Sequence, residues 1–258
     1  MNICCTERSE SLARLSISSA AAEVTGLIRG PYCKYSRTLP SNFSIARGEA
    51  CIVDPCYWCP ALPFRYQVSL EINFENGEKD QLEFLWGLRW CVPHKHDLRL
   101  HGKRYVVRAV QARHEDLDLT ELRGGAAALV TAADNVNLLD QASEIGVMVI
   151  VAGGLTTDES YRGLNLFPAV HFVKDFPAGA TPRDVLGIAS DPNQMPRAAL
   201  HWIEASEIPR YATYAKPIFA AQASDSDDVA DMRRACDRLQ RDLAKYGQYA
   251  GYVIHSGE

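Results

Sequence analysis

The sequence predicts two consecutive domains, an all-β immunoglobulin-like sandwich over residues 1–100 and a shortened (β/α)8 barrel of the TIM type over residues 101–258. Two observations carry this prediction. Before the boundary, apolar and polar residues alternate as in half-buried antiparallel strands. After it, short strands that are apolar throughout alternate with helical stretches, which is typical of a parallel sheet covered by helices.

The first domain is predicted from strands and turns. Residues 66–74 alternate at period two, and Asn76-Gly77 supplies a hairpin turn before a second strand at 82–88. Further short strands at 23–29 and 49–53 are bounded by Gly, Pro or Asn. This spacing fits an antiparallel sandwich of about seven strands.

The second domain is predicted from seven apolar strands, at 105–110, 127–131, 147–152, 170–173, 185–189, 218–221 and 252–254. Two stretches between them, 135–144 and 226–246, carry apolar residues at helical spacing. A closed eightfold barrel usually needs roughly 200 residues or more, and roughly 155 remain here. We therefore expect missing helices or an incomplete wall.

Composition excludes several classes of partner. The net charge of −5 comes from interspersed acids and bases, so the chain lacks the basic stripe that a nucleic acid requires. Apolar runs fall far short of the roughly 20 residues that cross a bilayer, and the N-terminus does not read as a secretory signal. The sequence predicts a cytoplasmic protein with no membrane or nucleic-acid partner and no cofactor.

Eight cysteines raise the question of a metal site. A single Cys-x-x-Cys stands at 56–59, and a structural zinc site would need a second pair drawn from Cys4, Cys5, Cys33 and Cys51. Without a secretory signal, reduced thiols are favoured over a disulfide framework. We expect no metal.

Seven segments stand in an order that matches a known family. They are Trp-Cys-Pro-Ala-Leu-Pro-Phe-Arg-Tyr at 58–66, Trp-Gly-Leu-Arg at 86–89, the stretches 98–110 and 138–149, Phe-Pro-Ala-Val at 167–170, Lys-Pro-Ile-Phe at 216–219 and Gly-Tyr-Val-Ile-His at 251–255. Together they resemble the sandwich and barrel domains of family 2 glycoside hydrolases, the β-galactosidase and β-glucuronidase type. The family's N-terminal sugar-binding domain has no counterpart here.

The resemblance also implies that both catalytic glutamates are missing. In the family, the strand matched by 167–170 leads to Asn-Glu, and the strand matched by 216–219 leads to Glu. Counting along the strands places these positions at Pro177-Ala178 and at Gln222. Retaining hydrolysis needs a carboxylic acid and a carboxylate about 5 Å apart, and neither a methyl group nor an amide can replace them. The resemblance thus predicts a non-catalytic scaffold for binding or assembly, with carbohydrate as one candidate ligand.

Two alternatives stay open. Asp175 near the end of the fourth barrel strand, Asp191 beyond the fifth and Glu204 on the helix after it could act as relocated carboxylates of an active glycoside hydrolase. In the other alternative, a short barrel leaves an apolar wall exposed, and a second copy of the chain or another protein covers it.

Several further side chains are candidates for ligand binding. Gln222, Trp202 and His255, which stands at the end of the last strand, are expected at the barrel mouth. Tyr211 and Tyr214 could stack on sugars, although core packing is the default for aromatic residues.

Other chemistry has little support. Among the histidines at 114, 171, 201 and 255, His171 lies in an apolar strand and is expected to be a core residue. Gly153-Gly154 could cradle a phosphate but is better explained as a plain loop. No Gly-x-Ser-x-Gly and no His-Glu-x-x-His occurs, so neither a serine nucleophile nor catalytic zinc is indicated.

Overall fold

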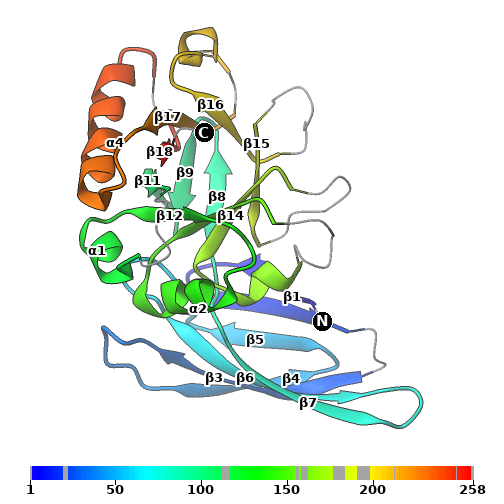
Figure 1. The fold of residues 1–258 in the computed structure, drawn as a ribbon. Helices are drawn as coiled ribbons and strands as arrows, with labels where there is room; N and C mark the ends of the chain where they lie inside the picture. The colour runs from blue at the N-terminus through cyan, green and yellow to red at the C-terminus, as the bar shows by residue number, and fades with distance from the viewer. Residues whose placement is uncertain are drawn as a thin grey trace.

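The protein consists of an antiparallel sheet that packs under a parallel barrel (Figure 1). The computed structural model describes residues 2–19, 23–111, 117–154, 157, 162–176, 184–190, 198–211, 213–214, 216–247 and 249–256. No helix within these ranges is long and apolar enough to cross a membrane.

The N-terminal part is one curled sheet of seven antiparallel strands in the order β1-β2-β5-β4-β3-β6-β7. The strands are β1 (Asn2–Arg8), β2 (Leu12–Ser18), β3 (Glu23–Tyr32), β4 (Ser41–Ala46), β5 (Glu49–Val53), β6 (Arg65–Asn73) and β7 (Lys79–Trp86). The predicted hairpin is confirmed, because β6 and β7 pair in continuous register from Tyr66 and Trp86 to Asn73 and Lys79. Alternating residues of these strands, including Ile28 and Val68, are fully buried in the sheet's own apolar core.

A small three-stranded meander links the sheet to the barrel. It contains β8 (Cys91–His94), β9 (Asp97–Leu100) and β10 (Lys103–Tyr105) in the order β10-β9-β8. His101 and Gly102, where the sequence predicts the domain boundary, form the turn between β9 and β10. Both have positive φ, 51° and 76°, as a tight turn requires.

The barrel is closed by eight parallel strands in sequence order. They are β11 (Val107–Val110), β12 (Ala128–Thr131), β13 (Val149–Ala152), β14 (Val170–Lys174), β15 (Leu186–Ala189), β16 (Leu200–Glu204), β17 (Ile218–Ser224) and β18 (Gly251–Ser256). The barrel is short, as predicted, but the alternative of an incomplete wall was wrong, because β18 pairs with both β11 and β17.

One barrel strand was missed by the sequence prediction. Glu204, expected on a helix, ends the sixth barrel strand, β16. Its first four residues, Leu200 to Ile203, are buried. A short apolar run of this kind reads equally well as a buried strand or as part of a buried helix.

Three α-helices and two 3₁₀ turns cover the described part of the barrel: α1 (Leu119–Gly124), α2 (Val136–Ile145), α4 (Val229–Leu243), η1 (Leu164–Leu166) and η2 (Ile208–Tyr211). Both predicted helices are confirmed. The Asn135 side chain caps α2, and Gly146 ends it in the left-handed conformation with φ 92°. In α4 the buried residues Met232, Cys236 and Leu239 form the face that packs on β11 and β18.

Two buried side chains connect the sheet side of the molecule to the barrel. Arg89 donates from Nη1 to the carbonyls of Phe167 and Val170, each at 2.8 Å. The indole N–H of Trp58 donates to the carbonyl of Ser143 on α2 at 2.9 Å. Buried carbonyls need such partners, so these bonds fix how the two parts meet.

Candidate functional site

The interior face of the barrel can be identified from one aromatic contact. Phe172 of β14 and Phe219 of β17 meet edge to face with ring centroids 5.1 Å apart, although two strands separate them in the wall. Rings so placed touch only across the barrel interior. Because side chains alternate along a strand, Lys174 also points inward on β14, as do Ala221 and Ala223 on β17.

Four side chains meet at the mouth, which is the end of the barrel where the strands finish. They are Lys174 of β14, Trp202 and Glu204 of β16 and His255 of β18. These are alternate strands of the wall, and alternate strands supply the layers of side chains that fill such barrels. The C-terminal strand ends are also where barrel enzymes of this type carry their active sites.

The mouth combines an apolar floor with polar groups above it. The Lys174 ammonium lies 4.4 Å from the centroid of the Trp202 ring, which is 6% exposed. Such a cation–π contact contributes about 0.5–2 kcal/mol, depending on exposure. The imidazole of His255 lies 6.2 Å from the Trp202 ring and places Nε2 3.4 Å from a carboxylate oxygen of Glu204. Trp202 is therefore covered, and the groups that can reach a ligand are Lys174, Glu204 and His255.

The sequence matches no family model and no curated protein. Solved structures do match. A family 2 glycosyl hydrolase from Bacteroides cellulosilyticus gives a TM-score of 0.65 at 12% identity, over 99% of this chain and 43% of that one. The fold is that of family 2 glycoside hydrolases.

Two further structures agree. The β-glucuronidase from Ruminococcus gnavus gives a TM-score of 0.70 at 10% identity, over 98% of this chain and 59% of that one. The β-D-glucuronidase of Dictyoglomus thermophilum gives 0.61 at 14% identity, over 98% and 61%. The chain thus spans between 43% and 61% of the length of these three proteins. Identities this low establish a shared fold and leave activity open.

Gln222, the residue matched to one family 2 glutamate, is not aimed into the barrel. It alternates with the inward residues Ala221 and Ala223 and pairs with Ile254, which lies on the outer face of β18. The two inward residues near the end of β17 are both alanines. If the alignment of this strand with the family 2 strand is shifted by one residue, the matched position is still an alanine and carries no carboxylate. The loss of the glutamate stays a prediction.

Asp175, one of the three candidates for a relocated carboxylate, forms hydrogen bonds within the barrel wall. Its two carboxylate oxygens accept hydrogen bonds from the backbone N–H and the hydroxyl of Ser190, at 2.9 and 2.8 Å. Its own N–H donates to the carbonyl of Ile188 at 2.8 Å, and its φ is 51°. These bonds join the ends of β14 and β15, which is a structural role for this side chain.

Of the remaining candidates, His171 is among the described residues and three others are not. Ala178, Asp191 and His114 lie outside them. His171 is buried against Trp58, with ring centroids 5.1 Å apart, and burial lowers its pKa to about 3. It is a neutral core histidine, as the sequence suggests.

The mouth contains one residue that sequence reasoning missed. Lys174 ends a strand whose other four residues are buried, and a lone charge at the C-terminal end of a barrel strand is the signal that could have found it. Among the described residues no cluster of three or more His, Cys, Asp or Glu could hold a metal. Gly153 and Gly154 turn the chain after β13 with φ of 83° and 77°.

Proposed function

We propose that this protein is a non-catalytic relative of family 2 glycoside hydrolases that binds a carbohydrate at the barrel mouth. The observation that carries the proposal is the pair of alanines, Ala221 and Ala223, on the inward face of β17. Covalent glycoside hydrolysis needs a carboxylate nucleophile beside a carboxylic acid. A methyl group supplies neither.

The other mouth residues support binding rather than bond cleavage. Glu204 is close to the imidazole of His255, at 3.4 Å, and Asp175 accepts two hydrogen bonds from Ser190. Lys174, Glu204 and His255 offer a donor, an acceptor and a ring nitrogen above the Trp202 floor, a combination that suits a hydroxyl-bearing ring. The ligand class itself rests on analogy with the fold.

The second candidate is a hydrolase with a relocated acid. It is favoured by Glu204, which the β16 strand brings to the mouth instead of leaving it on an outer helix. Such an enzyme would pair Glu204 with a second carboxyl group about 5 to 9.5 Å away, for which Asp191 is the sequence candidate.

Turnover and binding assays separate the two. We expect no release of 4-nitrophenol from a panel of 4-nitrophenyl glycosides, and saturable saccharide binding by isothermal titration calorimetry that weakens at least tenfold in Lys174→Ala and His255→Ala. Glu49→Gln, an exposed glutamate on β5, serves as the matched control for Glu204→Gln. Turnover that disappears in Glu204→Gln or Asp191→Asn but persists in Glu49→Gln would favour the hydrolase.

A further inference from the structure

Strand β7 ends the seven-stranded sheet on one side and lies along its border in Figure 1. It is eight residues long, contains neither Gly nor Pro, and pairs with β6 without a bulge. A strand at the edge of a sheet offers a row of backbone N–H and C=O groups to a further strand. Long and regular edges therefore favour pairing, and proteins usually protect them.

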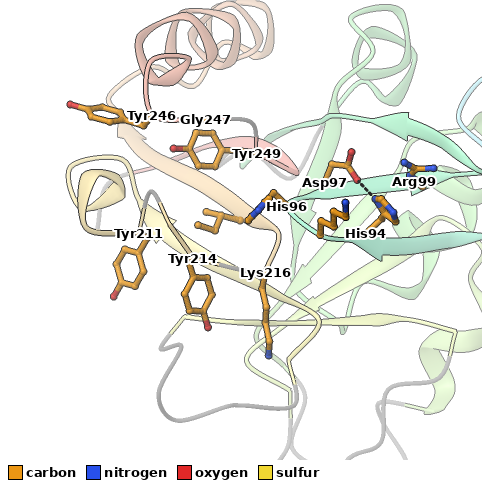
Figure 2. A pocket seen from close by; sticks show the side chains of 12 residues that line it. His94, His96, Asp97, Arg99, Tyr211, Tyr214, Lys216, Tyr246, Gly247 and Tyr249 are labelled. Atoms are coloured by element: carbon orange, nitrogen blue, oxygen red, sulfur yellow. Dashed lines mark ion pairs between the residues drawn. The ribbon is translucent and has the colours of Figure 1, made fainter.

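The other sheet edges in the described part of the chain carry such protection. β1, at the opposite edge of the same sheet, is interrupted by a bulge between Cys5 and Glu7. β8 and β10, the edges of the meander, have four and three residues, and β8 contains Pro93. The β8–β9 hairpin also faces Tyr211 and Tyr214, which line a pocket with it at the end of the barrel away from the mouth (Figure 2). The closed barrel has no edge.

β7 also leaves apolar side chains at this border. Leu82 and Phe84, on the core side of the sheet, are half-buried, and Leu85 on the other side is 44% exposed. Their neighbours on β6 differ: Leu70, paired with Leu82, is 2% exposed, and Val68, paired with Phe84, is 0% exposed. A further strand beside β7 would remove this apolar surface from water, which is favourable. Both the backbone and the side chains of β7 therefore favour one more strand.

The charges of β7 indicate which strand that is. Lys79, Asp80 and Glu83 are exposed and could guard the edge, because like charges opposite each other are unfavourable. In a sheet that continues across a two-fold axis, each register is centred on one residue that faces its own copy. A register centred on Glu83 sets two carboxylates face to face. One centred on Phe84 joins no opposite charges, and one centred on Gln81 joins Lys79 to Glu83 but pairs less of each strand.

A register centred on Leu82 pairs nearly the whole of both strands without such a repulsion. Leu82 meets its own copy, and Gln81 lies opposite Glu83 of the second copy. Lys79 is then diagonal to that Glu83, which is within reach of a long side chain. Glu83 also accepts a hydrogen bond at 3.1 Å from the Ser69 hydroxyl of its own chain, and a carboxylate can accept several. The two-fold axis makes each of these contacts twice.

We propose that this protein forms a dimer in which β7 pairs antiparallel with β7 of a second copy, centred on Leu82. One sheet then runs through both chains, and Lys79 of each copy meets Glu83 of the other. Main-chain hydrogen bonds provide the attraction, as when a peptide adds a strand to a sheet edge. The charges fix the register. The dimer does not depend on the proposed function of the barrel mouth.

Sedimentation velocity at concentrations up to about 100 µM, where weak associations are populated, tests for the dimer. We expect the sedimenting mass to rise with concentration toward that of two chains. Hydrogen exchange of the β7 amides should slow over the same range, because amides that face solvent in the monomer are bonded in the dimer.

Charge reversal tests the register. Lys79→Glu and Glu83→Lys should each weaken the dimer at least tenfold, since each brings like charges together twice. Lys103→Glu and Glu49→Lys, which reverse exposed charges on β10 and β5, are the matched controls and should leave it unchanged.

Restoring the charge pair distinguishes a lost contact from a misfolded variant. The double variant Lys79→Glu/Glu83→Lys should dimerise like wild type, and so should an equimolar mixture of the two single variants, because both bring opposite charges together again. Misfolded chains would recover in neither case. The proposal is overturned if wild type stays monomeric, if the single reversals weaken the dimer no more than the controls, or if neither the double variant nor the mixture restores it. Exchange that slows elsewhere but not in β7 would place the contact on another surface and also overturn it.

Discussion

Replacing Arg89 with alanine should destabilise the whole protein, because this side chain joins the sheet region to the barrel. Arg89 is 3% exposed. Besides its two bonds at 2.8 Å to the carbonyls of Phe167 and Val170, its Nη2 lies 3.1 Å from the side-chain oxygen of Asn165 and 3.3 Å from that residue's carbonyl. All four acceptors belong to residues 165–170, which lead into β14 and open it.

The magnitude follows from these bonds. A hydrogen bond to a charged group contributes about 1.5–3 kcal/mol, so the two bonds at 2.8 Å alone account for about 3–6 kcal/mol. The bonds to Asn165 are longer and are not additive with them. Water that enters the space left by the side chain can satisfy part of the loss. We expect Arg89→Ala to lower the free energy of unfolding by about 3–5 kcal/mol, a large share of the usual 5–15 kcal/mol.

Urea denaturation followed by circular dichroism measures this change. Arg89→Lys keeps the charge but offers a single ammonium in place of the guanidinium fork, so it should fall between wild type and alanine. Arg14→Ala is the control, because its ion pair with Glu7 is exposed on both sides and is worth at most about 1 kcal/mol. A loss in Arg89→Ala no larger than the loss in Arg14→Ala would refute the reasoning.

Three further predictions concern the same region. Gly87→Ala should lower stability by about 1–3 kcal/mol, measured by urea denaturation, because an added Cβ would lie 2.6 Å from Cβ of Pro168. Trp58→Phe should cost about 1–3 kcal/mol in the same assay, since it leaves the Ser143 carbonyl without its indole donor. His171 binds no proton in the folded state until about pH 3, whereas it does so near 6.5 when unfolded. The contribution of His171 to the free energy of unfolding is therefore complete above pH 6.5. As the pH falls from 6.5 to about 3, the free energy of unfolding decreases by about 1.4 kcal/mol per pH unit. His171→Gln should flatten the stability profile there, and equal slopes in both proteins would contradict this.

Local patterns were sufficient for most of the fold. The hairpin turn at Asn76-Gly77, the Asn135 cap and the glycine end of α2, and the apolar stripe of α4 all follow from chemistry within a few residues. β16 was missed because five residues do not contain enough periodicity to separate a buried strand from a helix.

The site was harder to predict because it is assembled from distant strands. Trp202 and His255 were candidates, and the structure brings them together with Glu204. Lys174 was not a candidate, and its contact with Trp202 depends on the closure of the wall. The orientation of Gln222 depends on which face of β17 is inward, which in turn depends on the contact between Phe172 and Phe219 across the barrel.

The segments that resemble the family act mainly at the junction between sheet and barrel. Arg89, from the Trp-Gly-Leu-Arg segment, bonds to the 167–170 segment, against which Gly87 also packs. Trp58, from the first segment, bonds to Ser143 in the 138–149 segment. Arg89 and Trp58 satisfy buried carbonyls at the junction between the sheet and the barrel, and this role does not depend on which side chains lie at the mouth. Resemblance in these segments therefore predicts the fold well and carries no information about turnover. Turnover depends on the ends of the strands, where Ala221 and Ala223 face inward.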